Sequence, residues 1–201
     1  MLRVENLYKR YGNFLALNGL QMNVRKGELF GFVGPNGAGK TTTIRIIAGL
    51  LSASSGEVWV DGQGVGKDLK VLKNHIGFVP DFFGLYDNLT VMEYLEFYAA
   101  AYQIPAREQK RRAQEVLELV NLPQVEDQYV DTLSRGMQQK LCVARALIHK
   151  PPLLVMDEPG SGLDPRTRRE FKELLKQLRQ MDYTILISSH ILSELADMCT
   201  G

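Results

Sequence analysis

The chain has 201 residues, of which 45% are hydrophobic, and a formal net charge of +1 at pH 7. This size and composition suit a single large domain, or a domain with a subdomain, built around a shared core. The small net charge argues against binding nucleic acid through bulk positive charge, so we expect no direct nucleic-acid partner. No apolar run approaches the ~20 residues that span a bilayer, so we expect any membrane role to come through a partner.

Two segments near the N-terminus, 2–8 and 15–24, alternate in part between apolar and polar residues. This pattern predicts antiparallel edge strands. Tyr11 stands on the turn between them, where its ring could stack on a base or take part in packing. Further along, 54–62 reads as a turn, a strand and a turn, and we expect Trp59 to lie in the core.

The most informative segment is a complete G-x-x-x-x-G-K-[ST] phosphate-binding loop. It follows the apolar run 29–33, which predicts a buried strand, and precedes a helical pattern that starts at Thr43. In this setting the glycines turn backbone N–H groups toward a β-phosphate, Lys40 neutralises phosphate oxygens and Thr41 offers a hydroxyl to Mg²⁺. A glycine-rich turn without a ligand is the disfavoured alternative. The residues expected to bind the phosphates are Gly34, Pro35, Asn36, Gly37, Ala38, Gly39, Lys40, Thr41 and Thr42.

Helical periodicity prevails after Thr90, which forms a capping box with Glu93 three residues on. The pattern predicts a second helix from about Ala106. A third helix is expected to run from Ser134, a good N-cap, to about residue 149.

Two apolar strands in the second half of the chain each end in polar residues. The segment 153–156 runs into Asp157 and Glu158, and the segment 183–188 is followed shortly by His190. Parallel strands bring such ends to one edge of a sheet, where open α/β sheets bind their ligands. We therefore expect these residues to meet the phosphate-binding loop around one nucleotide.

In this order the residues resemble the nucleotide-binding subunits of ABC transporters, and the resemblance covers essentially the whole chain. The motifs that carry it are Tyr11, the phosphate loop, the signature segment Leu133–Gln139, the acidic strand end 157–158, the turn Ser161–Asp164 and His190. The resemblance implies an α/β P-loop NTPase fold, with a RecA-like, mostly parallel sheet, an antiparallel β subdomain and a helical subdomain. The implied division of this single ABC ATPase domain is 1–81 and 146–201 for the catalytic core with its β subdomain, and 82–145 for the helical subdomain.

The same resemblance implies roles for individual residues, with ATP and Mg²⁺ as the cofactors. Asp157 looks like the carboxylate that holds Mg²⁺ through water, and Glu158 like the general base or orienter of the attacking water. His190 resembles the residue that contacts the γ-phosphate, so Glu158, His190 and Lys40 are the expected catalytic residues. Tyr11 is then expected to stack on the adenine.

Ser134 and Gly136 of the signature resemble the element that caps ATP bound to the opposite subunit of a head-to-tail dimer. The implied partners are a second ABC ATPase subunit, identical or different, and transmembrane permease subunits. The implied function is hydrolysis of ATP to power transport, in the direction of export. The chain would act as a peripheral protein at the cytoplasmic face of the membrane.

Three residues depart from the family pattern. Asp81 follows a short buried strand at 75–80, where the family usually has a Gln that contacts Mg²⁺; Asp81 keeps an oxygen ligand, or it is only a turn residue. Arg135 and Met137 replace the usual Gly and Gln of the signature. Together with the segment 81–91, these residues resemble the multidrug, antibiotic and lipid export branch of bacterial ABC ATPases.

Two other functions remain as alternatives. An ABC-type ATPase that acts on ribosomes or nucleic acid usually has two nucleotide domains, a zinc module or a long coiled-coil insertion, which this sequence does not show. A nucleotide-binding module that regulates without hydrolysis is disfavoured by Glu158 and His190. Because relatives continue beyond the equivalent of Gly201, we expect this to be a C-terminally truncated or partial chain.

Overall fold

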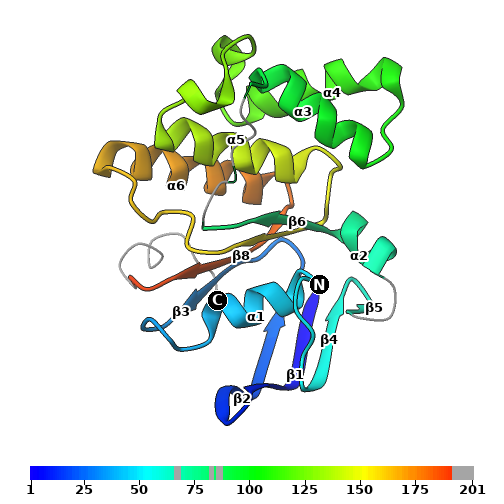
Figure 1. The fold of residues 1–201 in the computed structure, drawn as a ribbon, viewed down its shortest axis with the longest axis vertical. Helices are drawn as coiled ribbons and strands as arrows, with labels where there is room; N and C mark the ends of the chain where they lie inside the picture. The colour runs from blue at the N-terminus through cyan, green and yellow to red at the C-terminus, as the bar shows by residue number, and fades with distance from the viewer. Residues whose placement is uncertain (66–68, 82–83, 85–87, 192–201) are drawn as a thin grey trace.

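The structure, a computed structural model, describes residues 1–65, 69–81, 84 and 88–191. Two β-sheets and the helices around them form layers (Figure 1). A parallel sheet lies in the middle, α1 separates it from an antiparallel sheet, and the longer helices cover its other face. Most of the segment 82–87 and the residues after Ile191 lie outside the described residues.

The antiparallel sheet has the strand order β2-β1-β4-β5. β1 and β2 pair from Leu2 opposite Val24 to Tyr11 opposite Phe14, which confirms the two N-terminal strands and extends the first through Tyr11. The first strand is longer than predicted because its last residues form backbone hydrogen bonds with the second strand, and the sequence pattern does not show this pairing. The strands are β1 Leu2–Tyr11, β2 Phe14–Val24, β4 Ser55–Val60 and β5 Gln63–Gly64.

Trp59 is not in the core as expected. Its neighbours Val58 and Val60 are buried, whereas Trp59 points to the other side of β4 and is only half-buried. There its ring lies under the Arg3 guanidinium, 5.6 Å from Cζ to the ring centroid. Side chains alternate between the two faces of a strand, and this alternation determines where Trp59 points even though its ring is hydrophobic.

The parallel sheet has the order β3-β8-β7-β6, which confirms the expected parallel strands. Both faces are buried: along β7, Leu153 and Val155 pack toward α1, whereas Leu154 and Met156 pack toward the longer helices. Two covered faces explain the continuous apolar runs in the sequence. The strands are β3 Leu29–Val33, β6 Ile76–Val79, β7 Leu153–Met156 and β8 Thr184–Ser189.

Three helices begin directly after a side-chain cap, whereas α1 begins at Lys40, three residues before the expected start at Thr43. The Thr90–Glu93 capping box precedes α3, Ser134 caps α5 and Asp164 caps α6. The third helix of the sequence prediction, α5, ends at Leu147, slightly before the expected end. The helices are α1 Lys40–Ile47, α2 Leu69–His75, α3 Val91–Ala101, α4 Ala106–Leu119, α5 Arg135–Leu147 and α6 Pro165–Gln180, with 3₁₀ turns at Pro123–Val125 and Val130–Thr132.

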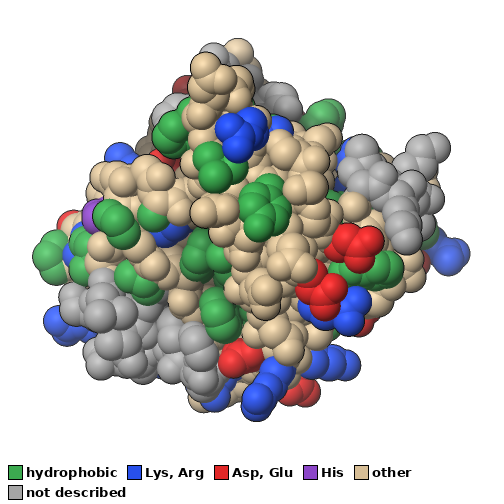
Figure 2. All heavy atoms as spheres, turned by 90° about the horizontal axis from the view of Figure 1, so that it is seen from below, with side chains coloured by type: hydrophobic (Ala, Val, Ile, Leu, Met, Phe, Trp, Pro, Cys, Tyr) green, Lys and Arg blue, Asp and Glu red, His purple; other side chains and the backbone are tan. Residues whose placement is uncertain are grey.

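The surface is mixed in character. Seen from below, the end formed by the antiparallel sheet has hydrophobic, basic and acidic side chains interspersed (Figure 2). In the part of the chain that the structure describes, every helix is too short or too polar to cross a lipid bilayer.

Candidate nucleotide site

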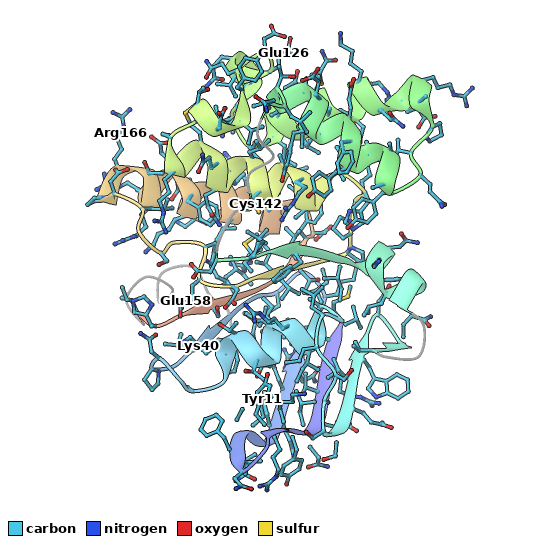
Figure 3. All side chains as sticks on the ribbon, in the orientation of Figure 1. Tyr11, Lys40, Glu126, Cys142, Glu158 and Arg166 are labelled. Carbon is cyan, nitrogen blue, oxygen red and sulfur yellow. The ribbon has the colours of Figure 1, made fainter. Side chains whose placement is uncertain are left out.

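The site lies at the carboxyl ends of β3, β7 and β8. The phosphate loop leaves β3, Asp157 and Glu158 follow β7, and His190 follows β8. Lys40, at the start of α1, lies beside Glu158 (Figure 3). The parallel pairing of β7 and β8, and of β8 and β3, thus brings together residues that are far apart in the sequence.

Gly39 fits the phosphate loop tightly against β2. Its backbone is left-handed, with φ of 87°, and it is the N-cap of α1 without a side-chain capping bond. A Cβ at this position would lie 2.6 Å from Leu17 Cδ2 and 2.8 Å from the Ala16 carbonyl oxygen. Because no side chain caps it, the start of α1 offers its N–H groups and positive dipole end to an anion.

Lys40 is held by the loop and by Glu158. Its ammonium donates to the carbonyl oxygens of Gly34 at 2.7 Å and Pro35 at 3.1 Å, and it lies 3.2 Å from Glu158 Oε1. Only 5% of its side chain is exposed. A buried ammonium needs anionic or polar partners, and here the carboxylate of Glu158 provides the negative charge.

Glu158 contacts two side chains from different parts of the chain, Lys40 and His190. Its Oε2 lies 2.5 Å from His190 Nδ1, while its Oε1 contacts Lys40. Burial raises the pKa of Glu158, but hydrogen bonds and charges of His190 and Lys40 outweigh burial and leave the pKa below its usual range. Glu158 is therefore ionised at neutral pH.

The backbone of Glu158 is also unusual. Its φ is 45°, in the left-handed region that few non-glycine residues occupy. Its N–H donates to Ser188 Oγ at 2.9 Å, and its carbonyl accepts from the Ser161 N–H at 3.0 Å. Such conformations cluster at functional sites and persist only when surrounding bonds hold them.

The chemistry of Thr41 and Asp157 suits Mg²⁺. The Thr41 hydroxyl donates to Asp157 Oδ1 at 3.2 Å, so two hard oxygen donors stand side by side next to the phosphate loop. Within the described ranges, no group of three His, Cys, Asp or Glu side chains could close around a metal. A Mg²⁺ ion held here would complete its shell with water and phosphate oxygens, as this ion usually does.

Asp81 stands just after β6 and is exposed. Partial burial of the carboxyl and the charges of Asp157 and Glu158 raise its pKa, whereas the charge of Arg135 opposes that rise. The carboxyl of Asp81 therefore shares the electrostatic environment of the site, which keeps it as a candidate oxygen ligand.

Tyr11 lies apart from Lys40 and Glu158, on the antiparallel hairpin (Figure 3). Its side chain is 48% exposed, and the Lys9 ammonium lies 5.0 Å from the ring centroid. An exposed ring keeps a face available for a base, as adenine stacking requires.

The two signature residues lie at the start of α5. Ser134 Oγ accepts from the Met137 N–H at 3.4 Å. Gly136 packs against Thr167 of α6, so tightly that any Cβ at this position would collide with the threonine methyl group. The small size of Gly136 is thus required by the approach of two helices of the same chain.

Ser188 is a residue of the site that no sequence motif singled out. Its hydroxyl donates to Asp157 Oδ1 at 2.9 Å and accepts from the Glu158 N–H, and the residue is fully buried. A small polar residue at the end of an apolar strand, next to other strand ends with carboxylates, is the signal that points to it.

Comparison with known proteins shows the family of the chain. A family described as ABC transporter matches residues 17–161. The linearmycin resistance ATP-binding protein LnrL of Bacillus subtilis (strain 168) is 42% identical over 199 residues, 99% of this chain and 64% of that protein. The bacitracin transport ATP-binding protein BcrA of Bacillus licheniformis is 40% identical over 199 residues, 98% of this chain and 64% of that protein. The chain thus spans less than two thirds of these relatives.

Solved structures share the fold. A dimeric ATP-binding cassette in a post-hydrolysis state, bound to ADP and Pi, has a TM-score of 0.86 at 30% identity, covering 96% of this chain and 90% of that one. The protein cbiO1 from Clostridium perfringens, part of the ABC transporter complex cbiONQ, has a TM-score of 0.89 at 29% identity, covering 98% of this chain and 81% of that one. The expected P-loop fold class is confirmed, and the chain belongs to the ABC transporter family.

Proposed function

We propose that this chain is the ATP-binding and ATP-hydrolysing part of an ABC exporter. The observation that carries the proposal is the position of the Glu158 carboxylate between Lys40 and His190, beside Asp157. Lysine, carboxylate and histidine come from three different strand ends and meet at the loop that suits a phosphate. Relatives named for linearmycin resistance and bacitracin transport support the direction of export.

The Lys40 ammonium and the His190 ring would bind the γ-phosphate. An incoming phosphate gives them a new anionic partner and releases Glu158, whose carboxylate then orients a water molecule and accepts its proton. The water oxygen forms a bond to the γ-phosphorus, and the bond from phosphorus to the β–γ bridging oxygen breaks, leaving ADP. Catalysis rests on positioning and on charge stabilisation by Lys40, His190 and the N–H groups at the start of α1.

Thr41 and Asp157 would hold Mg²⁺, with Asp81 as a further oxygen ligand. When bound, the ion neutralises negative charge on the β- and γ-phosphates. Ser188 would keep the Asp157 carboxylate in place, because its hydroxyl donates to Asp157 Oδ1. Tyr11 would stack on the adenine with its exposed ring.

The working unit would be a head-to-tail dimer, in which Ser134 and Gly136 cap the nucleotide of the second subunit. Residues 82–145 would transmit closure and opening of the dimer to transmembrane permease subunits. The dimeric cassette among the structural neighbours and the membership of cbiO1 in a transporter complex support this arrangement. The protein would then reside at the cytoplasmic face of the membrane.

The test uses the full-length protein with Glu158→Gln. We expect ATP turnover to fall by about a hundredfold or more, since an amide cannot accept the proton of water. With Mg²⁺-ATP, this variant should dimerise in light scattering and co-purify from native membranes with a multi-span membrane protein. Glu118→Gln, on the exposed surface of α4, is the matched control.

Two results would contradict the proposal. If the Glu158→Gln variant kept its ATP turnover, Glu158 could not be the general base. Co-purification with ribosomes or nucleic acid, and with no membrane protein, would favour a non-transporter ABC ATPase.

A further inference from the structure

Arg135, which replaces the usual glycine of the signature, reaches a turn of the catalytic core. Its Nη2 donates to the Ser161 carbonyl oxygen at 2.9 Å. Its guanidinium lies on Gly162, whose φ is +68°, and a Cβ at that glycine would lie 2.6 Å from Arg135 Cζ. One side chain from the start of α5 thus holds two consecutive residues of the turn between β7 and α6.

The backbone of Ser161 links Arg135 to Glu158. While its carbonyl accepts from Arg135, its N–H donates to the Glu158 carbonyl oxygen at 3.0 Å. Glu158 has the left-handed backbone described above, which needs bonds on both sides to persist. Ser188 holds the N–H of Glu158, and the bonded turn holds its carbonyl.

Two further contacts fix α5 and α6 relative to each other. Gly136 packs against Thr167, whose N–H donates to Asp164 Oδ1 at 3.1 Å. One turn further along α5, the Lys140 ammonium lies 2.9 Å from Glu170 Oε2. The start of α5, which carries Arg135, is therefore held against α6 by packing and by an ion pair. The guanidinium thus extends from a fixed backbone.

Arg135 also acts on the charge of the site. Partial burial and the carboxylates of Asp157 and Glu158 raise the pKa of Asp81, and the positive charge of Arg135 opposes this effect. Its guanidinium is thus close enough to influence a carboxyl that departs from the family pattern. Arg135 and Asp81, which both depart from the family pattern, therefore interact electrostatically.

We propose that Arg135 is a positioning residue that holds the catalytic Glu158 of its own chain in place through the backbone of Ser161. This inference rests on the proposed function, because it assumes that Glu158 acts on ATP. A glycine at position 135 has no donor that reaches Ser161. A lysine retains the charge but lacks the planar fork that can donate to a carbonyl while lying flat on Gly162.

The test compares Arg135→Ala and Arg135→Lys in the full-length protein with Arg169→Ala, an exposed arginine of α6, as the control. For Arg135→Ala we expect kcat for ATP to fall about tenfold with KM changed less than about twofold, because only a transition-state group is displaced. Arg135→Lys should recover part of kcat. The control should keep the wild-type values.

A second measurement separates positioning from a structural defect. In single-turnover experiments, adding Arg135→Ala to Glu158→Gln should cause almost no further loss, because residues that act through one group are non-additive. The inference would be overturned if Arg135→Ala kept the wild-type kcat or changed KM alone. It would also be overturned if the Arg169→Ala control lost as much kcat, or if the losses in the double variant were additive. Should Arg135→Ala not fold, Arg135→Lys is the variant compared. Absence of ATP turnover in the wild-type protein would instead overturn the proposed function.

Discussion

Ser188 contacts both acidic residues of the site with one hydroxyl. It donates to Asp157 Oδ1 and accepts from the Glu158 N–H, each at 2.9 Å. In Ser188→Ala both bonds are lost, and the strained backbone of Glu158 loses one of its supports. We expect kcat for ATP to fall about tenfold and the free energy of unfolding to fall by about 1–3 kcal/mol, the usual cost of unpaired buried polar groups.

The matched variant for this prediction is Ser188→Thr, which keeps the hydroxyl. Steady-state ATP turnover and urea unfolding of both variants provide the measurements. Recovery of kcat by threonine shows that the hydroxyl matters, since the added methyl group alone can only disturb packing. Equal kcat in the alanine variant and the wild type would mean that Glu158 keeps its position without Ser188.

Single residues show where sequence reasoning succeeds and where it stops. Lys40 and Asp157 were predicted to lie at one site, because the first belongs to a motif and the second follows an apolar run, and both lie there in the structure. The hydrogen bond from Arg135 to Ser161 could not be predicted, because it joins residues 26 positions apart and depends on the conformation of a side chain. Trp59 was misplaced since hydrophobicity alone does not tell which face of a strand a residue occupies.

At the level of elements, the phosphate loop is shaped by its contact with β2. In Gly39→Ala, the new methyl group would combine a strained φ of 87° with overlap against Leu17 and the Ala16 carbonyl. We expect ATP binding to be lost and stability to fall by more than the about 1–2 kcal/mol of left-handed strain alone. Nucleotide titration and thermal unfolding would measure the two effects.

Gly12→Ala is the control for this prediction. Gly12 is also left-handed, with φ of +54°, but nothing lies within 4 Å of its Cβ position. This variant should therefore lose only the stability that backbone strain costs. Equal losses in Gly12→Ala and Gly39→Ala would show that the contact with β2 does not shape the loop.

The capping box of α3 gives a prediction about stability without an effect on catalysis. Thr90 Oγ1 accepts from the Glu93 N–H at 3.2 Å, and the Thr90 N–H donates to Glu93 Oε2 at 2.8 Å. Thr90→Ala should lower the free energy of unfolding by about 1 kcal/mol, and Thr90→Ser should preserve it. Urea unfolding measures both; an unchanged midpoint in Thr90→Ala would mean that water replaces the cap at no cost.

Elements were predicted well wherever a local signal exists. The caps at Thr90 and Ser134 were recognised because a short polar side chain precedes an apolar helical pattern. β1 was predicted too short, because its last residues are polar and owe their strand conformation to pairing with β2. Local signals therefore predict the start of an element better than an end that depends on a partner strand.

At the scale of the whole molecule, the parallel sheet joins two hydrophobic cores. One core lies between this sheet, α1 and the antiparallel sheet, and the other lies beneath α3 to α6. Because β7 and β8 contribute residues to both cores, the strand ends that carry the site are fixed from two sides. A rigid base of this kind supports the precise positioning on which phosphoryl transfer depends.

His149 connects the helical layer to the parallel sheet. Its ring stacks on Tyr102, just after α3, with centroids 3.8 Å apart, and its Nε2 lies 3.1 Å from the Ile76 carbonyl oxygen of β6. Burial lowers the pKa of His149 from 6.5 to about 4, and the nearby charge of Arg112 also lowers it, against the hydrogen bond to Ile76. The folded protein therefore keeps this histidine neutral where an unfolded chain would protonate it.

This difference predicts that the fold loses stability in mild acid. Because the unfolded state binds the proton first, the contribution of His149 is complete above pH 6.5 and is lost as the pH falls toward 4. Between about pH 7.5 and about pH 5.5 the loss from this one group should be about 1.4 kcal/mol. Urea unfolding at both pH values would measure it. In His149→Gln the drop should shrink by that amount, even if the variant is less stable at both; an unchanged drop would show that His149 is protonated in the folded protein.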